Sequence, residues 1–384
     1  MKVGQFSDTF LPVVDGVGRV VSHYAYLMGE LCEACYVIAP RQVNLVREGF
    51  SFEIVDYRSF PVPRNPQYRA GIPALDLSYR KRLVEIELDI VHAHSPFVAG
   101  REALRIARRR GIPLVATFHS KYYDDFYQTT GSKTLAELGT KYVVNFFAKC
   151  DQVWAVSSST AQVLRDYGYK GPIEIMENGT DLKEPDPAAA KEAEERFALG
   201  NLPVLLFVGQ MNWKKNIRRI LEAVSVLVKE GRELRLVMAG QGPSEAEIKE
   251  LASSLRLDDA VIYAGHISDG RILSGLYARA DLLVFPSLYD NAPMVVREAA
   301  AVGTPALLAS GSSAAEVVQD GVNGLLANDT SEEMAARIAW ALDHPAELRQ
   351  IGEAARGTIP KPWKDIVAQA LDRYEQLIRS KSGA

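Results

Sequence analysis

Short apolar runs alternate with longer segments of helical periodicity along most of the chain. Uninterrupted apolar runs predict strands that are buried on both faces, as in a parallel sheet. In the first half of the chain such runs lie at 2–6, 36–39, 52–55, 89–92, 114–118 and 153–156. The segments between them have helical spacing, and one of them ends at Gly111 and Pro113, which are typical of a helix end. This order predicts βαβ units.

The same pattern begins again after residue 180. Further strands are predicted at 203–208, 234–239, 260–264, 281–285 and 305–309. A length of 384 residues suits two domains of ordinary size. We therefore predict two α/β domains that meet near residue 180. Because ligands bind at the carboxyl ends of parallel strands, we expect the active site in the cleft between the domains.

Composition and charge narrow the class of protein. A hydrophobic content of 47% and a charged content of 24% are those of a globular protein, and a net charge of −4 argues against a nucleic-acid partner. The pattern of a signal peptide is missing, and no apolar run reaches the ~18 residues of a membrane span. We expect a cytoplasmic protein whose membrane contact, if any, is peripheral, at the inner face. We interpret Cys32, Cys35 and Cys150 as buried core thiols, because their spacing fits neither a disulfide framework nor a zinc site.

The tract 287–305 (SLYDNAPMVVREAAAVGTP) is the most informative for chemistry. Asp290 lies in a predicted loop, where its carboxylate can reach sugar hydroxyls, and Glu298 lies on the following helix, where it can reach a ribose. The start of that helix is suited to bind a phosphate, and it is formed by the backbone of Asn291, Ala292, Pro293, Met294 and Val295. The alternative interpretation is that Asp290 is an ordinary surface carboxylate and that the following helix only packs in the core.

A second strand–loop–helix tract is 208–224 (VGQMNWKKNIRRILEAV), with Lys214 and Lys215 just before the helix. Lysines at this place can pair with a diphosphate whose negative charge grows as a glycosidic bond breaks. The alternative is two solvated lysines, but cations at a helix start oppose the helix dipole. This mismatch favours a functional role.

Three histidines follow predicted strands: His92, His94 and His119. We interpret His119 as functional, whereas His92 and His94 fit a buried structural role equally well. Gly16 and Gly18 open the first helix, where the backbone could approach a phosphate or an acceptor. The glycine patterns of NAD-binding and P-loop proteins are both missing.

Taken together and in this order, the tracts resemble glycosyltransferase family 4, whose members are retaining enzymes of the GT-B fold. The spacing of Asp290 and Glu298 is similar to the family's E-x7-E motif. The sequence AAAVGTPALLA, which comes directly after Glu298, is also similar to the family's sequence at this place. GQMNWKKN resembles the family's loop G-R-L-x-x-x-K-[GN]. The segments VSSSTAQVLRDYG, ENGTD, MAGQGP and YAGHISDGRILSGLYARADLLVFPS also match, over essentially the whole chain.

The resemblance implies an α/β fold of the GT-B type, with two Rossmann-like domains facing a central cleft. Residues 1–180 would form the acceptor-binding domain and 181–360 the domain that binds the nucleotide-sugar donor. The helix in 361–384 would cross back to the N-terminal domain. No cofactor and no metal is implied, because lysines and helix dipoles would stabilise the leaving diphosphate.

The resemblance also assigns roles to single residues. Lys215 would bind the donor diphosphate, Asp290 would contact the transferred sugar, and His119 would lie beside that sugar near the anomeric carbon. Glu298 would hold the ribose. Other donor-binding candidates are Gly16 and Gly18 in the N-terminal loop, Gln210 and Lys214 beside the diphosphate, and the backbone of His266 and Ile267 beside the base.

Three positions depart from the family pattern. Gln210 stands where the family has an arginine, so one positive charge is missing; Asp290 is one methylene shorter than glutamate; and the paired glycines read Gly16-Val17-Gly18. The expected function is transfer of a hexose from a UDP- or GDP-sugar to an acceptor. The segments DTFLPVVDGV and HAHSPF are similar to those of a subgroup of the family for which a lipid or a saccharide is the expected acceptor. The alternatives are a catalytically weakened, sugar-nucleotide-binding relative and a sugar-nucleotide epimerase.

Overall fold

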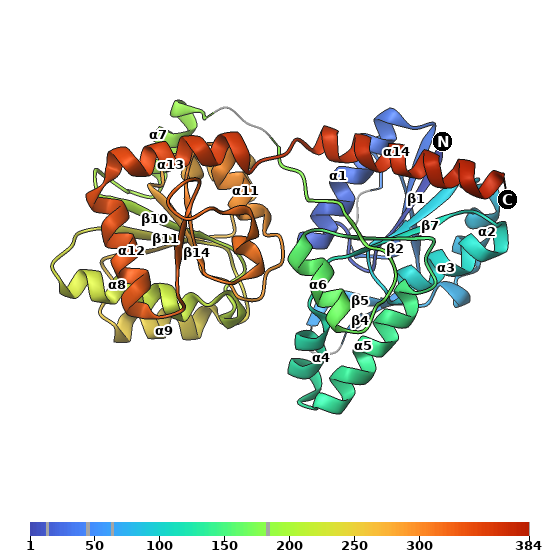
Figure 1. The fold of residues 1–384 in the computed structure, drawn as a ribbon, viewed down its shortest axis with the longest axis horizontal. Coiled ribbons are helices and arrows are strands. Elements are labelled where there is room, and N and C mark those ends of the chain that lie inside the picture. Colours follow the sequence, from blue (N-terminus) through green and yellow to red (C-terminus); the bar gives the residue numbers. More distant parts are fainter. Residues whose placement is uncertain (13–14, 44–46, 63–64, 182–184, 384) are drawn as a thin grey trace. The chain divides into compact units, whose positions relative to one another are not determined.

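A computed structural model describes residues 1–12, 15–43, 47–62, 65–181 and 185–383. The chain forms two compact units, each with its own sheet (Figure 1). One unit consists of Met1–Asn178 and Trp363–Ala384, and the other of Gly179–Pro362. The last segment of the chain therefore returns to the unit that contains the N-terminus.

The first unit is built on a parallel sheet with the strand order β3-β2-β1-β6-β7-β8-β9, beside an antiparallel hairpin, β4-β5. The strands are β1 (Lys2–Phe6), β2 (Ala34–Pro40), β3 (Glu53–Tyr57), β4 (Ser59–Val62), β5 (Asn65–Gly71), β6 (Ile90–Ala93), β7 (Leu114–Phe118), β8 (Gln152–Ala155) and β9 (Glu174–Ile175). The helices are α1 (Gly16–Leu31), η1 (Pro73–Leu75), α2 (Leu77–Glu85), α3 (Val98–Arg110), α4 (Tyr122–Thr130), α5 (Lys133–Phe147), α6 (Ser158–Asp166) and α14 (Trp363–Ser382).

The termini of these helices follow from local sequence. Asp15 caps α1, so the helix begins at Gly16, the first of the two glycines that the sequence placed at its start. Helix α3 ends at Gly111, which has a left-handed φ of 68°, as the sequence indicated. Helix α14 buries one face, and Tyr374 from this face stacks on Trp154 of β8.

The second unit has a parallel sheet with the order β12-β11-β10-β13-β14-β15. Its strands are β10 (Val204–Val208), β11 (Arg235–Ala239), β12 (Val261–Gly265), β13 (Leu282–Phe285), β14 (Ala306–Ala309) and β15 (Leu325–Ala327). Its helices are α7 (Pro187–Arg196), η2 (Trp213–Lys215), α8 (Ile217–Lys229), α9 (Glu245–Ser254), α10 (Gly270–Arg279), α11 (Met294–Ala301), η3 (Ser313–Val317), α12 (Ser331–Asp343) and α13 (Pro345–Thr358).

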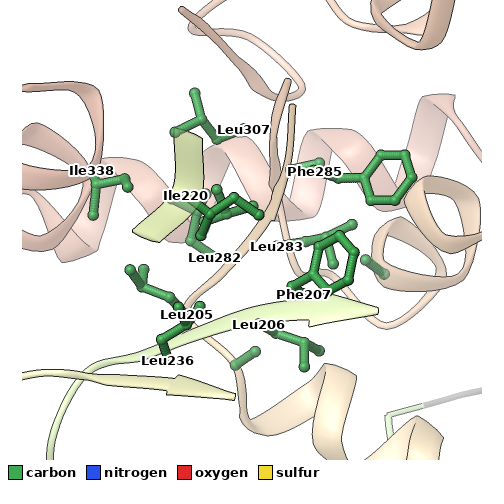
Figure 2. Packing of buried hydrophobic residues seen from close by; sticks show 14 of the residues in the cluster. Leu205, Leu206, Phe207, Ile220, Leu236, Leu282, Leu283, Phe285, Leu307 and Ile338 are labelled. Atoms are coloured by element: carbon green, nitrogen blue, oxygen red, sulfur yellow. The ribbon is translucent and has the colours of Figure 1, made fainter. Parts of the chain in front are cut away.

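Both faces of the second sheet are covered, which is why its strands are apolar at successive positions. Leu205 and Leu206 of β10 point to opposite faces and are both fully buried. Side chains from β13, α8 and α12 pack around β10, among them Leu282, Ile220 and Ile338 (Figure 2).

The predicted strands are confirmed to within about two residues at each end. The prediction omitted β4, β5, β9 and β15. Strands β9 and β15 are too short to give a periodic pattern, and Pro61 and Pro66 interrupt the hairpin sequence.

The strand order places a topological switch point in each unit. In the first unit the chain order reverses between β1 and β6, and in the second it reverses between β10 and β13. In open α/β sheets, ligands bind outside the carboxyl ends of the strands at such points. The loops after β10 and β13 carry Lys215 and Asp290, so two of the candidate residues lie where this fold binds ligands.

Candidate functional site

An ion pair joins the two loops at the switch point of the second unit. The ammonium of Lys215 lies 2.6 Å from Oδ1 and 2.8 Å from Oδ2 of Asp290. The two side chains are 17% and 20% exposed, so a ligand can still reach both. Ser287 donates a hydrogen bond of 2.6 Å to Oδ2 of Asp290 and fixes that carboxylate from the β13 side. The structure thus brings together the two residues that the resemblance assigned to the donor diphosphate and the transferred sugar.

The loop after β10 is held in place by its own asparagines. The side chain of Asn212 accepts a hydrogen bond from the backbone N–H of Lys214 and starts η2. Asn216 has a left-handed φ of 58° and donates to the carbonyl of Pro286 (3.2 Å) and to Asp329 (2.8 Å). Asn216 therefore ties the lysine loop to the end of β13. Sequence reasoning did not single it out, although asparagine is the residue expected at a left-handed position.

Lys214 points toward the same loop as Lys215. Its ammonium lies 4.7 Å from the centroid of the Tyr289 ring, and that of Lys215 lies 5.9 Å from it. Both cations are close enough to this ring for a cation–π interaction. Two positive charges therefore converge beside Tyr289, the chain neighbour of Asp290, whereas Gln210 at the start of the same lysine loop is neutral and exposed.

Three glycines bring the carboxyl ends of the neighbouring strands close together. Gly209 donates to the carbonyl of Ala239, and Gly240 donates to that of Gly265. Gly240 has a φ of 139°, and a Cβ there would lie 1.9 Å from the carbonyl oxygen of Gly209. Only glycine fits this approach. His266, which is exposed, and Ile267, which is half-buried, follow Gly265 at this edge of the sheet.

Helix α11 carries Glu298 on its second turn. The buried Tyr277 of α10 donates a hydrogen bond of 2.9 Å to Oε2 of Glu298, which sets the direction of that carboxylate. Sequence reasoning did not single out Tyr277.

The helix N-terminus differs in one respect from the predicted phosphate site. Helix α11 begins at Met294, and Pro293 is its N-cap. Proline has no N–H, so Pro293 cannot donate to a phosphate, which corrects its inclusion among the donor groups. Asn291 and Met294 are buried, and Ala292 and Val295 are partly exposed.

The remaining candidates lie in the first unit. Gly16 is exposed at the start of α1, and a Cβ there would meet no atom within 4 Å. The N–H of Gly18 donates to Oδ1 of Asp15 at 2.6 Å. An anion that approaches this helix end therefore meets a carboxylate, and burial raises the pKa of Asp15.

His119 follows β7 and belongs to a network of buried polar side chains. Its Nε2 lies 3.2 Å from Nδ1 of His94, and Nε2 of His94 lies 2.7 Å from Oε1 of Gln5. His92 contacts Tyr374 and Thr117 and has the buried, satisfied position that the sequence left open. Burial lowers the pKa of His119 to about 4 and holds the pKa values of His92 and His94 well below 6.5, so all three rings are neutral near pH 7.

Asp8 lies at the switch point of the first unit and was not predicted. Its carboxylate accepts hydrogen bonds from Ser95 (2.6 Å) and from the backbone N–H of Ala99 at the start of α3 (2.9 Å). Burial raises its pKa. An aspartate two residues after the end of the first strand is the signal that could have identified it.

Two expectations concern metals and membranes. Among the residues that the structure describes, no group of three His, Cys, Asp or Glu side chains could hold a metal ion. In the same described part of the chain, no helix is long and apolar enough to cross a membrane.

All three cysteines have free thiols, but Cys32 and Cys150 are only partly buried, which corrects the interpretation of three core thiols.

Two family patterns match the chain. Residues 14–184 match the family described as Glycosyltransferase Family 4, and residues 190–358 match that described as Glycosyl transferases group 1. Together they cover most of both units.

Curated relatives and solved structures agree with these matches. A GDP-mannose-dependent alpha-mannosyltransferase of Corynebacterium glutamicum is 28% identical over 98% of this chain and 89% of its own. An alpha-monoglucosyldiacylglycerol synthase of Streptococcus pneumoniae is 26% identical over 85% of this chain and 75% of its own.

Among solved structures, HepE of Anabaena in complex with UDP has a TM-score of 0.81 at 17% identity, covering 98% of this chain and 100% of that one. The sucrose-phosphate synthase of Thermosynechococcus elongatus has a TM-score of 0.81 at 18% identity, covering 99% of both chains. The chain belongs to the group 1 glycosyltransferases of the family 4 type, and it has the GT-B fold that its sequence predicted.

Proposed function

We propose that this glycosyltransferase moves a hexose from a UDP- or GDP-sugar to a lipid or saccharide acceptor, with retention of the anomeric configuration and without a metal ion. The observation that carries the proposal is the Lys215–Asp290 pair at the switch point of the second unit. It places a cation for the diphosphate beside a carboxylate for sugar hydroxyls.

The chemistry follows from these two side chains. The bond between the anomeric carbon and the diphosphate oxygen breaks, and a bond from the acceptor oxygen to the anomeric carbon forms. The acceptor proton leaves with the diphosphate or passes to water. Lys215, with Lys214 beside it, stabilises the charge that builds on the diphosphate, and this electrostatic term replaces a metal ion. Asp290 holds the sugar through its hydroxyl groups.

Names of the relatives support the class of substrates. Three relatives are named as GDP-mannose-dependent alpha-mannosyltransferases, and two are named as alpha-monoglucosyldiacylglycerol synthases. HepE was solved with UDP-glucose. These names favour a hexose, one of two nucleotides, and an acceptor that is a lipid or a saccharide.

One observation favours a second candidate, a weakened relative that binds sugar nucleotides and transfers slowly. Gln210 leaves the diphosphate with one charge partner fewer than the family pattern provides. If the protein is such a weakened relative, Lys214 does not compensate for the missing arginine.

A two-step experiment tests the proposal. Thermal shifts with GDP, UDP, GDP-mannose and UDP-glucose identify the nucleotide, since a ligand at 100 times its Kd stabilises the protein by about 2.7 kcal/mol. Transfer from that donor to lipid and saccharide acceptors is then followed, and the anomeric configuration of the product is read by NMR. Activity should persist in EDTA. Loss of activity in EDTA with recovery in magnesium, or an inverted product, contradicts the proposal. Donor binding without transfer to any acceptor supports the weakened relative, and donor consumption without an acceptor supports an epimerase.

A further inference from the structure

A chain of buried hydrogen bonds leads from Gln5 to His119 within the first unit. The side chains come from separate elements: Gln5 from β1, His94 from the end of β6 and His119 from the end of β7. Gln5, His94 and Tyr374 are at most 1% exposed. Because water does not reach these groups, each hydrogen bond needs a matched donor and acceptor.

The orientation of the Gln5 amide follows from its neighbours. Its Nε2 lies 3.2 Å from the sulfur of Met28 and 3.3 Å from the hydroxyl of Tyr374. A thioether sulfur can only accept a hydrogen bond, so the amide nitrogen must face Met28. The amide oxygen then faces Nε2 of His94 at 2.7 Å.

The amide oxygen fixes the proton positions along the chain. An amide oxygen only accepts, so Nε2 of His94 carries a hydrogen. His94 is neutral, because burial holds its pKa well below 6.5, and its Nδ1 is therefore an acceptor. Nδ1 of His94 accepts from Nε2 of His119 at 3.2 Å, which places the hydrogen of His119 on Nε2. The Nδ1 atom of His119 is then an acceptor as well.

The amide nitrogen of Gln5 begins a second series of hydrogen bonds, which leads to His92. Gln5 donates to the hydroxyl of Tyr374, which donates its own hydrogen to Nδ1 of His92 at 2.5 Å. Nε2 of His92 then donates to the hydroxyl of Thr117 at 2.7 Å. The ring of Tyr24 packs edge-on against His92 and His94, with centroids 5.8 Å and 5.7 Å away, and restricts their rotation.

We propose that Gln5 is a positioning residue that holds His119 in the tautomer with hydrogen on Nε2, so that Nδ1 accepts a hydrogen bond from a substrate hydroxyl. The tautomer is inferred from contacts within the first unit. The role of the substrate hydroxyl rests on the proposed function, because a hexose and its acceptor both carry hydroxyl groups. The two parts can therefore fail separately.

Histidine ring ¹⁵N–¹H correlation spectra of the full chain test the tautomer directly. The chain has six histidines, so a histidine-labelled, deuterated sample gives a simple spectrum, and a His119→Gln variant assigns the His119 signals. In the wild type, we expect a protonated Nε2 and an unprotonated Nδ1 for His119 near pH 7. A protonated Nδ1 at His119 overturns the proposal, and this result does not depend on any variant or on enzymatic activity.

Two variants separate positioning from packing. Gln5→Met keeps the length of the side chain and removes the amide, so a second tautomer of His119 should appear. Tyr374→Phe is the matched control, because it removes a hydroxyl from the same network but leaves the hydrogen bonds between Gln5 and His94 and between His94 and His119. This variant should leave the His119 signals unchanged. With the proposed donor, Gln5→Met should lower turnover about tenfold and leave nucleotide affinity unchanged. An unchanged His119 tautomer in folded Gln5→Met contradicts the role of Gln5.

Discussion

Lys215 and Asp290 are 75 residues apart in the sequence, yet the ammonium of one lies within hydrogen-bond distance of both carboxylate oxygens of the other. A diphosphate that binds Lys215 must therefore share this ammonium with Asp290. The same pair holds the lysine in the direction of the ligand before binding. Affinity and turnover should consequently respond differently when one partner is changed.

Removing Lys215 should weaken nucleotide diphosphate binding by at least tenfold, because a hydrogen bond to a charged group contributes about 1.5–3 kcal/mol. Lys214→Ala should cause a smaller but measurable loss if Lys214 replaces the missing arginine. Isothermal titration with the nucleotide selected by thermal shift measures both. Lys229→Ala, at the exposed end of α8, is the control for loss of one positive charge. Unchanged affinity in Lys214→Ala contradicts the compensation.

Asp290→Asn should lower turnover roughly thirtyfold, since a positioning hydrogen bond from a charged group contributes about 2 kcal/mol. Free nucleotide diphosphate should bind more tightly to this variant, because Lys215 no longer shares its charge. Ser287→Ala removes a hydrogen bond to Asp290 but keeps the ion pair, and is the matched control. The free energy of unfolding should fall by only about 1 kcal/mol, because the pair is partly exposed. Wild-type turnover in Asp290→Asn would falsify the assigned role.

Tyr277 should act on the nucleotide through Glu298. Glu298→Gln should weaken nucleotide affinity more than it lowers turnover, because a ribose contact is the same in the ground and transition states. Tyr277→Phe should weaken affinity by a few-fold, as expected for one lost hydrogen bond. In a double-mutant cycle the two effects should not add, because both residues act through one contact. Strictly additive losses of affinity would show that Tyr277 acts independently of Glu298.

Acid should destabilise the first unit through its buried histidines. Burial lowers the pKa of His119 from 6.5 to about 4, so the unfolded chain binds more protons than the folded protein between these values. The stability contributed by the neutral ring is therefore complete above pH 6.5 and falls as the pH drops toward 4. Between pH 7 and pH 5 the wild type should lose roughly 1–2 kcal/mol relative to His119→Gln. Urea unfolding at both pH values measures this difference, and equal losses in the two proteins contradict it.

A lipid acceptor would require peripheral membrane contact, which we expect through the basic face of α3. Arg101, Arg105, Arg108 and Arg109 are all exposed on this helix, but Arg105 pairs with Glu102 and Arg101 covers the Tyr142 ring. The contact with Tyr142 leaves the charge of Arg101 intact, so the charge for an anionic surface comes mainly from Arg101, Arg108 and Arg109. Sedimentation with anionic vesicles should show binding that falls with salt.

Charge reversal provides the control for that experiment. Reversing both Arg108 and Arg109 to glutamate should abolish vesicle binding, whereas Arg349→Glu, exposed on α13, should not. Salt-independent binding, or binding that survives the double reversal, rejects this surface.

The sequence by itself determined the fold class and most of the strands. Buried parallel strands such as β10 and β13 are apolar at successive positions, because both faces of the sheet are covered, and this signal is local. Four candidate residues could be selected in the same way, because each follows a strand or lies on the helix after it. These residues are Lys215, Asp290, Glu298 and His119. The resemblance to the family rested on such tracts in their order.

Only the tertiary structure decided which of these side chains touch. The ion pair of Lys215 with Asp290 depends on β10 and β13 being neighbours in the sheet, and the contact of Tyr277 with Glu298 depends on the packing of α10 against α11. The network from Gln5 to His119 joins three strands whose residues are far apart in the chain. Hydrogen bonds require partners within about 3 Å, and a linear pattern of residue types contains no information on such distances. The tautomer of His119 is therefore a property of the fold.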